Sequence, residues 1–401
     1  MIHICFALHD KTGRYSKFTG TTMLSLFDNT NSEVTVHILH DNTLSFDNRE
    51  KFIYLAGRYN QHVKFYNVEQ LCADKIAEIK NSIPRVLNSG FTIATFYRFL
   101  IPYIFSSEID KVIYLDSDLI VNLDIAELWR IELDGRPIAG VSEHMLGSDP
   151  RWFVMCRDGL VKLEDYFNAG VIVMDLNVFR AEEQRLLNGI KFIAANPQYN
   201  FFDQDVLNYC FSTTALKLPT KFNVLVRDLR IKPNQRIERK IYHYAAAGTQ
   251  LNSNDIFNRL WLKYFLKTPF FDEDTIGRLY ASFQQIHVQL KRSMMNISAT
   301  VSGKTRVFFD AAANVNAIKQ MFSLRKGEEV ITPENGGIQR LLDAMKKSRG
   351  KKVFFIMPPN FPYKVLTDAG FEFGKDFVNG LEFLSEEQGL PLNSNAMINA
   401  M

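Results

Sequence analysis

The chain has 401 residues, of which 46% are apolar and 13% aromatic, enough to fill a sizeable core. This length predicts two domains, one large and one small. The net charge of +3, with both signs mixed along the chain, argues against a nucleic-acid binder that depends on a concentrated basic face.

The start of the chain, "MIHICFALHD", predicts a first strand, because a secretion signal would carry basic residues ahead of its apolar run. No run approaches the roughly 18 apolar residues that cross a bilayer. The four cysteines lie far apart and form no CxxC pair, which favours free thiols in a reducing compartment. We therefore expect a cytoplasmic protein, with the inner face of the membrane as an alternative place of action.

Along the first 270 residues, short apolar strand candidates alternate with longer amphipathic stretches. The predicted strands are 2–8, 34–40, 62–68, 111–117, 137–143 and 169–176. Helices are predicted near 16–28, 46–59 and 92–105, another begins within 201–211, and the sheet ends around 240–248. This alternation indicates an α/β fold with a mixed, mainly parallel sheet, in which ligands bind at the strand ends.

After residue 270 the pattern changes. We predict a helical linker over 271–301, a second, small α/β domain over 302–390 and a mobile tail over 391–401. The small domain has neither a GxGxxG nor a GxxxxGK[ST] loop, so no second nucleotide site is predicted.

The predicted linker contains a long amphipathic helical pattern, 273–297. Its Arg278, Lys291 and Arg292 stand beside apolar residues and could touch a membrane that holds a lipid-linked acceptor. Such a helix more often packs between two domains. Peripheral membrane contact therefore stays one of two interpretations.

Three Asp-x-Asp pairs occur, at Asp116 and Asp118, Asp203 and Asp205, and Asp272 and Asp274. Because roughly one or two such pairs are expected by chance in this composition, the spacing alone decides nothing. The last pair follows Pro269 and precedes a helical pattern, where acidic residues favour the helix N-terminus. Its interpretation is therefore structural.

The first pair, Asp116 and Asp118, follows the apolar run "KVIYL". In an extended chain, residues i and i+2 point the same way, so both carboxylates would sit together at the end of a buried strand. Desolvating two charges without a partner is costly. A divalent cation such as Mg²⁺ or Mn²⁺ is the natural partner for two carboxylates.

Two classes of reaction use such a pair. Phosphatases of the haloacid dehalogenase type attack phosphorus with the first aspartate, but they carry the pair near the start of the domain, and their later metal site often contains adjacent aspartates, which this chain lacks. In glycosyl transfer from a nucleotide sugar, a cation held by Asp-x-Asp bridges the diphosphate and neutralises the leaving group. We favour the transferase.

Seven motifs, one of which contains this acidic pair, occur in one order along about residues 1–270. They are "FALHDKTGRY", "TIATFYRFLIP", "YLDSDLIV", "YFNAGVIVMDL", "FFDQDVLN", "KFNVL" and "IYHY". On these motifs the sequence resembles the retaining glycosyltransferases of family 8, of the bacterial galactosyl- and glucosyltransferase type. The resemblance implies a GT-A, Rossmann-like nucleotide-sugar-binding domain over 1–270.

The resemblance also implies a metal site. Asp116 and Asp118 would bind Mn²⁺ or Mg²⁺, and His243 of "IYHY" would supply the third protein ligand. An imidazole beside two carboxylates shifts the preference towards Mn²⁺. Outside this family, a single histidine near a strand end is more often structural.

For the UDP-sugar donor, the resemblance implies several contacts. The expected donor-binding residues are Ala7, Asp10, Tyr15, Arg98, Asp116, Ser117, Asn168, Ala169 and Gly170. Ala7, Asp10 and Tyr15 would hold the uridine, with His9 an alternative to Asp10 and ordinary packing an alternative for Tyr15. Arg98 would reach the donor sugar or diphosphate, unless it faces solvent. The segment 168–170 would lie along the sugar, unless Asn168 caps a turn.

The expected catalytic residues are Asp203 and Gln204. Asp203 would bind sugar hydroxyls, and Gln204 would lie near the anomeric carbon, opposite the leaving group, where it would stabilise an oxocarbenium-like transition state. Asp203, Gln204 and Asp205 belong to one helical pattern. An alternative is therefore that only one of these three side chains points inward.

One segment departs from the family pattern. After His243 the family usually has a Gly and then a Lys that clamps the diphosphate, whereas this chain has Ala246 and Thr249. Losing the positive charge of this Lys would weaken the stabilisation of the leaving diphosphate. We expect a transferase that moves glucose or galactose from the UDP-sugar, with retention, to a cell-surface glycan, lipid-linked saccharide or glycoprotein; the alternative is a nucleotide-sugar-binding module with weak or no activity.

Overall fold

The computed structural model of the protein describes residues 1–88, 91–144, 146, 149–230, 235–245, 255–273, 275–277, 280–281, 284–285, 303–322, 324–335, 337–358 and 361–380. The chain divides into two compact units, Met1–Ile276 and Gly277–Met401. In the described part of the chain, no helix is long and apolar enough to cross a membrane. Several predictions lie largely or wholly outside the described residues: the helix over 273–297 with its basic residues, the segment with Ala246 and Thr249, and the tail.

The first unit is built on a seven-stranded sheet in the order β3-β2-β1-β4-β7-β6-β8. Its strands are β1 (Ile2–Leu8), β2 (Val34–His40), β3 (His62–Asn67), β4 (Lys111–Leu115), β6 (Ile138–Ser142), β7 (Phe167–Asp175) and β8 (Leu216–Lys217). The first four in the order run parallel, and β7 runs antiparallel to both β4 and β6. The predicted mixed, mainly parallel sheet is confirmed.

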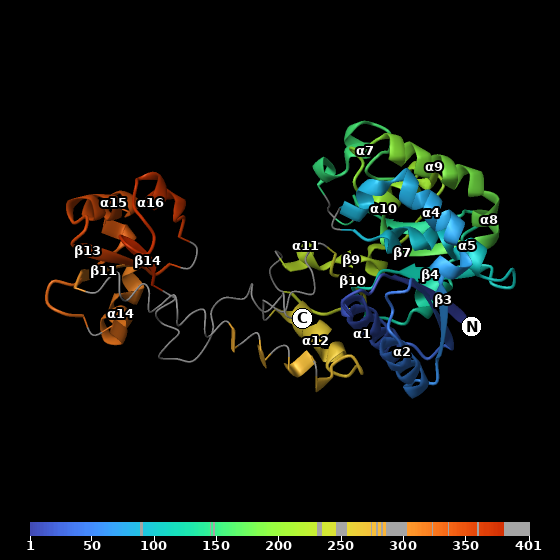
Figure 1. The fold of residues 1–401 in the computed structure, drawn as a ribbon, viewed down its shortest axis with the longest axis horizontal. Coiled ribbons are helices and arrows are strands. Elements are labelled where there is room, and N and C mark those ends of the chain that lie inside the picture. The colour runs from blue at the N-terminus through green and yellow to red at the C-terminus, as the bar shows by residue number, and fades with distance from the viewer. Residues whose placement is uncertain are drawn as a thin grey trace. The chain divides into compact units, whose positions relative to one another are not determined.

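Helices cover both faces of this sheet (Figure 1). One side carries α1 (Arg14–Asp28) and α2 (Phe46–Arg58), and the other carries α4 (Ala73–Ser82), α5 (Ile101–Ile104), α8 (Leu176–Ala181), α9 (Glu183–Ala195) and α10 (Phe202–Phe211). The remaining helical elements are α3 (Val68–Leu71), α6 (Ala126–Trp129), α7 (Val154–Arg157), α11 (Val226–Arg230), α12 (Ile256–Phe265), η1 (Pro84–Asn88), η2 (Ile93–Leu100), η3 (Pro150–Trp152) and η4 (Thr220–Phe222).

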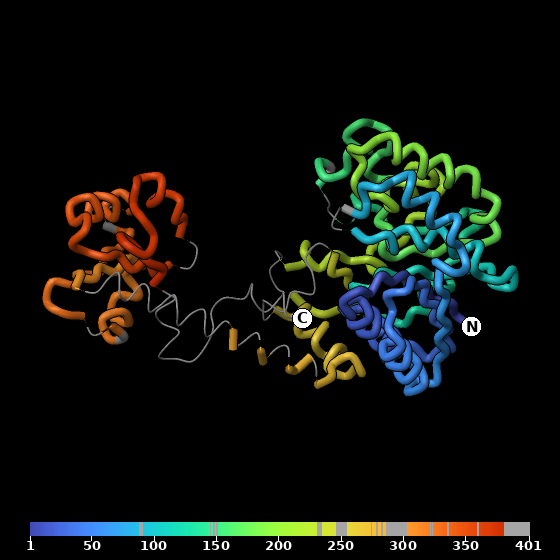
Figure 2. The backbone as a smooth tube through the Cα atoms, viewed as in Figure 1, coloured from blue at the N-terminus to red at the C-terminus, as the bar shows by residue number. Residues whose placement is uncertain are grey.

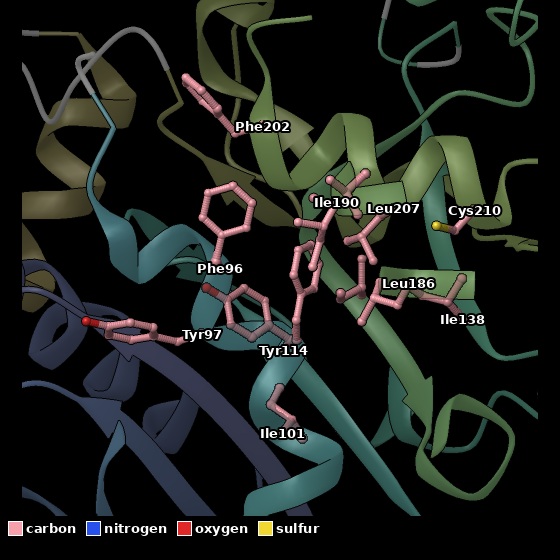
Figure 3. Packing of buried hydrophobic residues seen from close by; sticks show 14 of the residues in the cluster. Phe96, Tyr97, Ile101, Tyr114, Ile138, Leu186, Ile190, Phe202, Leu207 and Cys210 are labelled. Carbon is pink, nitrogen blue, oxygen red and sulfur yellow. The ribbon is translucent and has the colours of Figure 1, made fainter. Parts of the chain in front are cut away.

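A large apolar core of this unit lies between the sheet and the second helical layer. Figure 3 shows Tyr114, from β4, among side chains of the helical layer such as Phe96 and Ile190. Burying such large apolar side chains stabilises the fold by about 1.5–3 kcal/mol each. This packing holds the end of β4 against η2 and α10, which carry the expected site residues.

Helices are present over most of the predicted range 92–105, divided into the 3-10 helix η2 and the short α5. Pro102 has no N–H to donate to the carbonyl of residue 98, so a continuous α-helix would lose a hydrogen bond there. In a 3-10 helix, residues three apart lie on one face, which puts Thr95 directly beside Arg98.

The segment near residues 240–248 was predicted to complete the main sheet, and this is wrong. Instead β10 (Ile241–His243) pairs with β5 (Leu119–Val121) and β9 (Val224–Leu225) in a separate three-stranded sheet. The antiparallel register sets His243 opposite Leu119, and the Tyr244 N–H donates to the Asp118 carbonyl at 2.9 Å. This pairing sets His243 close to Asp118, near the end of β4.

The second unit contains its own parallel sheet in the order β12-β11-β13-β14. Its elements are β11 (Thr305–Phe309), η5 (Ala312–Asn314), α14 (Val315–Phe322), β12 (Glu329–Ile331), η6 (Pro333–Asn335), α15 (Gly337–Lys347), β13 (Lys352–Ile356), α16 (Lys364–Asp368) and β14 (Phe377–Asn379). Separate apolar clusters pack around Phe309 and around Phe308, neighbours that point to opposite faces of the sheet. The tube in Figure 2 traces this α/β unit in orange and red.

Candidate active site

The first acidic pair stands at the end of β4, where the main sheet gives way to β5. Between the two aspartates, Ser117 is directed towards α1: its hydroxyl accepts from Thr19 Oγ1 at 2.8 Å, and its carbonyl accepts from Thr22 Oγ1 at 2.7 Å. Because neighbouring side chains of an extended segment point in opposite directions, Asp116 and Asp118 share the other side.

His243 meets the pair from β10. Its Nε2 lies 3.4 Å from Asp118 Oδ1 and 3.8 Å from Asp116 Oδ2, and one ligand atom from each residue lies within 4.8 Å of the others. Burial opposes a charge on His243, but the carboxylates of Asp118 and Asp116 nevertheless raise its pKa. The cluster therefore favours a positive charge at its centre.

The donor atoms of this cluster fit a divalent cation. His243 Nδ1 lies 3.0 Å from Asn223 Oδ1, an acceptor, so Nδ1 carries a proton, and Nε2, which faces the two carboxylates, is the nitrogen that can give up its proton to bind a cation. Such an outer hydrogen bond is typical of metal-binding histidines. Two carboxylate oxygens and one imidazole nitrogen suit Mn²⁺ better than Mg²⁺, which prefers oxygen alone.

Gly170, on β7, lies against the cluster. A Cβ atom at this position would overlap the His243 ring and stand 2.8 Å from Asp116 Oδ2. The Gly170 carbonyl also accepts from the Asp116 N–H at 2.8 Å, which extends the pairing of β4 with β7. The absence of a side chain thus lets the strand approach the ligands closely.

We predict that Gly170→Ala lowers the affinity for Mn²⁺ by about 10–100-fold, the range found when groups around a metal site are disturbed. The reason is that the new methyl group must displace a ligand. Counting free Mn²⁺ by electron paramagnetic resonance measures the change. Gly57→Ala, in α2, is the matched control, because a Cβ there meets nothing within 4 Å. Equal Mn²⁺ affinities in the two variants would refute the prediction.

Arg98 of η2 is only 4% exposed and does not face solvent. Its guanidinium makes four hydrogen bonds and one further ion pair. Its partners are the Thr95 carbonyl (3.1 Å from Nε), the Ala169 carbonyl and Asp203 Oδ2 (2.6 and 3.1 Å from Nη1), and the Tyr114 hydroxyl and Asp116 Oδ1 (3.1 and 3.0 Å from Nη2). The guanidinium thus joins Asp116 of the cluster to Asp203 of α10.

Burial opposes the charge of Arg98, but the carboxylates of Asp203 and Asp116 together with the Tyr114 hydroxyl raise its pKa. Conversely, burial raises the pKa of Asp203 although Arg98 opposes the shift. Asp203 also accepts a hydrogen bond from the Thr95 hydroxyl. The site is therefore a buried network of alternating charge.

Asp203, Gln204 and Asp205 are all buried, so the alternative that only one of them points inward is wrong. Gln204 Oε1 accepts from the Ala169 N–H at 3.0 Å, and Asp205 accepts from the Tyr166 hydroxyl at 2.6 Å. The N-terminal turn of α10 is enclosed by β7 on one side and η2 on the other, so side chains in several directions meet protein.

We predict that Asp205 makes the free energy of unfolding fall as pH rises from about 4 to about 6. Burial raises the pKa of Asp205 from 3.8 to about 6, so in this window the folded protein holds a proton that the unfolded chain has lost. The contribution then decreases by about 1.4 kcal/mol per pH unit. Denaturant titrations across this range measure it. The same slope in Asp205→Asn, whatever that variant's absolute stability, would contradict the assignment.

The expected uridine-binding residues lie at the start of α1. Ala7 is half-buried on β1. The Asp10 carboxylate accepts from the Ser16 N–H at 3.1 Å and from Asn48 Nδ2 at 3.0 Å, which ties α1 to α2. Tyr15 is 38% exposed, and burial together with the charge of Asp118 raises its pKa. The structure therefore places Tyr15 near the cluster, and the uridine contacts stay predictions.

Comparison with known proteins identifies the family. The model of glycosyl transferase family 8 matches residues 4–248, more than half of the chain. The chain belongs to glycosyltransferase family 8. This membership in an enzyme family decides between the two reaction classes, and the phosphatase interpretation is dropped.

Among relatives of this family 8 protein, lipopolysaccharide 1,3-galactosyltransferase of Salmonella typhimurium is 27% identical over 205 residues, which cover 49% of the chain and 56% of the relative. General stress protein A of Bacillus subtilis is 25% identical over 252 residues, 61% of the chain and 81% of the relative. The chain thus spans little more than half of the Salmonella protein.

The galactosyltransferase LgtC, solved with donor and acceptor sugar analogues, superposes with a TM-score of 0.51 at 19% identity, covering 69% of this chain and 99% of LgtC. At this identity the likeness shows the fold, which is of the GT-A type.

Two buried polar residues of the site had no role in the sequence-based prediction. Glu143 follows β6, and Asn223 lies between η4 and β9. The signal for Glu143 was the one used for Asp116, a charge directly after an apolar strand candidate. Asn223 stands inside the motif "KFNVL", but an amide offers no charge to draw notice.

Proposed function

We propose that this family 8 protein is a metal-dependent, retaining transferase that moves glucose or galactose from a UDP-sugar to a glycan. The cluster of Asp116, Asp118 and His243 at the end of β4 carries the proposal, because its atoms fit a cation and strand ends of this fold bind ligands. The name of the Salmonella relative, a galactosyltransferase, supports a hexose donor.

In this proposal Asp116, Asp118 and His243 hold Mn²⁺, or Mg²⁺ in its place. When bound, the cation would neutralise the donor diphosphate as the bond to the sugar breaks. The nucleotide would bind on the side of the cluster that faces α1, with contacts to Ala7, Asp10, Tyr15 and Ser117.

The donor sugar would lie against the part of the site that α10 and β7 form. Asp203, held by Arg98 at 3.1 Å, would accept hydrogen bonds from its hydroxyls. Gln204 would stabilise positive charge at the anomeric carbon from the face opposite the diphosphate. The backbone of 168–170 would run along the sugar. All three guanidinium nitrogens of Arg98 are engaged with protein, so we assign Arg98 to holding the two carboxylates. Contact with the donor, as the resemblance implies, would require it to exchange one of these partners.

The acceptor would be a cell-surface glycan, a lipid-linked saccharide or a glycoprotein. We place catalysis in residues 1–270, joined by a linker over 271–301 to an accessory domain over 302–390. The free state of Cys5, Cys72, Cys156 and Cys210 supports a reducing compartment, the cytoplasm or the inner face of its membrane.

The deciding experiment titrates the full chain with a panel of UDP-sugars in the presence of Mn²⁺, Mg²⁺ or a chelator, and follows binding by calorimetry and turnover by release of UDP. We expect one UDP-hexose to bind and turn over only with metal. If none binds in a metal-dependent way, the proposal fails. Binding without turnover would favour the nucleotide-sugar-binding module, which Thr249 in place of the expected Lys suggests.

A further inference from the structure

A chain of hydrogen bonds runs from Glu143 to the candidate metal ligand. Asn168 Nδ2 donates to Glu143 Oε1 at 2.8 Å, Asn223 Nδ2 donates to Asn168 Oδ1 at 2.8 Å, and Asn223 Oδ1 faces His243 Nδ1 at 3.0 Å. All four residues are buried. Water is therefore a poor substitute for any bond in the chain.

The direction of this chain is fixed by groups that cannot turn round. Asn168 presents its NH₂ group to Glu143, whose Oε1 accepts from it. At its other end, Asn168 Oδ1 accepts from the backbone N–H of Gly170 at 3.0 Å, and a backbone N–H only donates. The amide of Asn168 thus has one orientation that satisfies both neighbours.

The same reasoning carries along the chain. Asn168 Oδ1 is an acceptor, so Asn223 must turn its NH₂ group towards it and its oxygen towards His243. That oxygen requires a proton on Nδ1, so Nε2, 3.4 Å from Asp118 Oδ1, is the nitrogen whose lone pair becomes available when a cation displaces its proton. A flipped Asn223 would put its NH₂ group against Nδ1 and favour the opposite tautomer, with a proton pointing into the cation position.

Glu143 also orders the other half of the site. Its Oε1 accepts from Gln204 Nε2 at 3.3 Å, while Gln204 Oε1 accepts from the Ala169 N–H at 3.0 Å. Glu143 Oε1 therefore accepts two hydrogen bonds. One comes from Asn168, which leads on to His243, and the other comes from Gln204.

We propose that Glu143, Asn168 and Asn223 form a positioning relay that sets the tautomer of His243, so that Nε2 is free to bind the cation. The inference rests on the proposed metal site. The three residues act through His243 and need not touch substrate, and loss of such a supporting bond costs about 10–100-fold in metal affinity.

The primary test reads the tautomer in the metal-free protein. With ¹⁵N-labelled histidine, nitrogen chemical shifts at alkaline pH show which ring nitrogen carries the proton, and a His243→Gln spectrum assigns the signal. In the neutral ring Asn223 competes for the proton with the carboxylates beside Nε2, so we expect a larger fraction with the proton on Nδ1 in the wild type than in Asn223→Leu, together with a 10–100-fold weaker Mn²⁺ affinity in that variant. Asn29→Leu, at a half-buried asparagine that follows the C-terminal end of α1, is the control and should keep both properties.

A charge exchange tests the direction of the relay and keeps it testable if Asn223→Leu fails to fold. Asn168→Asp alone sets two carboxylates against each other and should weaken Mn²⁺ binding. Adding Glu143→Gln turns an NH₂ group towards the new carboxylate, whose other oxygen can still accept from Gly170 and Asn223. The double variant should recover at least part of the lost affinity.

Three results separate this inference from the proposed function. An unchanged fraction with the proton on Nδ1 in Asn223→Leu, or equal Mn²⁺ affinities of Asn168→Asp and the double variant, would overturn the relay even if UDP-sugars are turned over. The expected tautomers with no turnover of any donor would support the relay and overturn the proposed transferase alone.

Discussion

Replacing Asp118 with asparagine is expected to weaken Mn²⁺ binding by more than about 100-fold and to abolish metal-dependent binding of the donor. Disturbing groups around a metal site already costs about 10–100-fold, and this change removes a ligand itself. Calorimetric titration with Mn²⁺, followed by UDP-sugar, measures both effects.

The fold should survive this substitution. The Asp118 side chain is 32% exposed, and the hydrogen bond from Tyr244 is made to its backbone carbonyl. Asp47→Asn is the control, because that carboxylate is 73% exposed and its side chain stands on α2. Unchanged Mn²⁺ affinity in Asp118→Asn would exclude this residue as a ligand.

Arg98→Met is expected to lower the free energy of unfolding of the first unit by about 3–5 kcal/mol, the cost of removing one partner from a buried ion pair. The change leaves Asp203 and Asp116 without their shared cation, and it also removes the donors to the Ala169 and Thr95 carbonyls. Methionine fills most of the volume, so the loss measures charge and hydrogen bonding more than packing.

Tryptophan fluorescence during denaturant titration follows this unit alone, because Trp129, Trp152 and Trp261 all lie within Met1–Ile276. Arg151→Met is the matched control: that side chain is 89% exposed, so water screens its pair with Asp149 and the pair contributes little to stability. Similar losses in the two variants would show that Arg98 does not hold the network together.

Local patterns were sufficient for the main elements of the first unit. The alternation of short apolar runs with amphipathic stretches predicted β1, β2 and β3 with α1 and α2 between them, because burial of one face imposes a period on each segment. The helical segment predicted over 92–105 is also present, but its division into the 3-10 helix η2 and the short α5 was not predicted.

The site was only partly accessible from sequence. Two carboxylates after a buried strand can be noticed from their cost in free energy, so Asp116 and Asp118 could be chosen by physical reasoning. His243 was chosen through the family resemblance, since no local pattern joins it to residues more than a hundred positions earlier. The burial of Arg98 was not foreseen, because a helical period cannot show that five acceptors surround one guanidinium.

By itself, then, the sequence determined the α/β class, the order of most elements and the acidic pair, because these depend on neighbours within a few residues. Only the tertiary structure decided that β10 pairs with β5 and carries His243 to Asp118, and that Asn223 orients its ring. Such contacts join residues far apart in the chain, and a hydrogen bond between two amides leaves no trace in composition, charge or period. Its direction depends on which donors and acceptors the fold sets face to face.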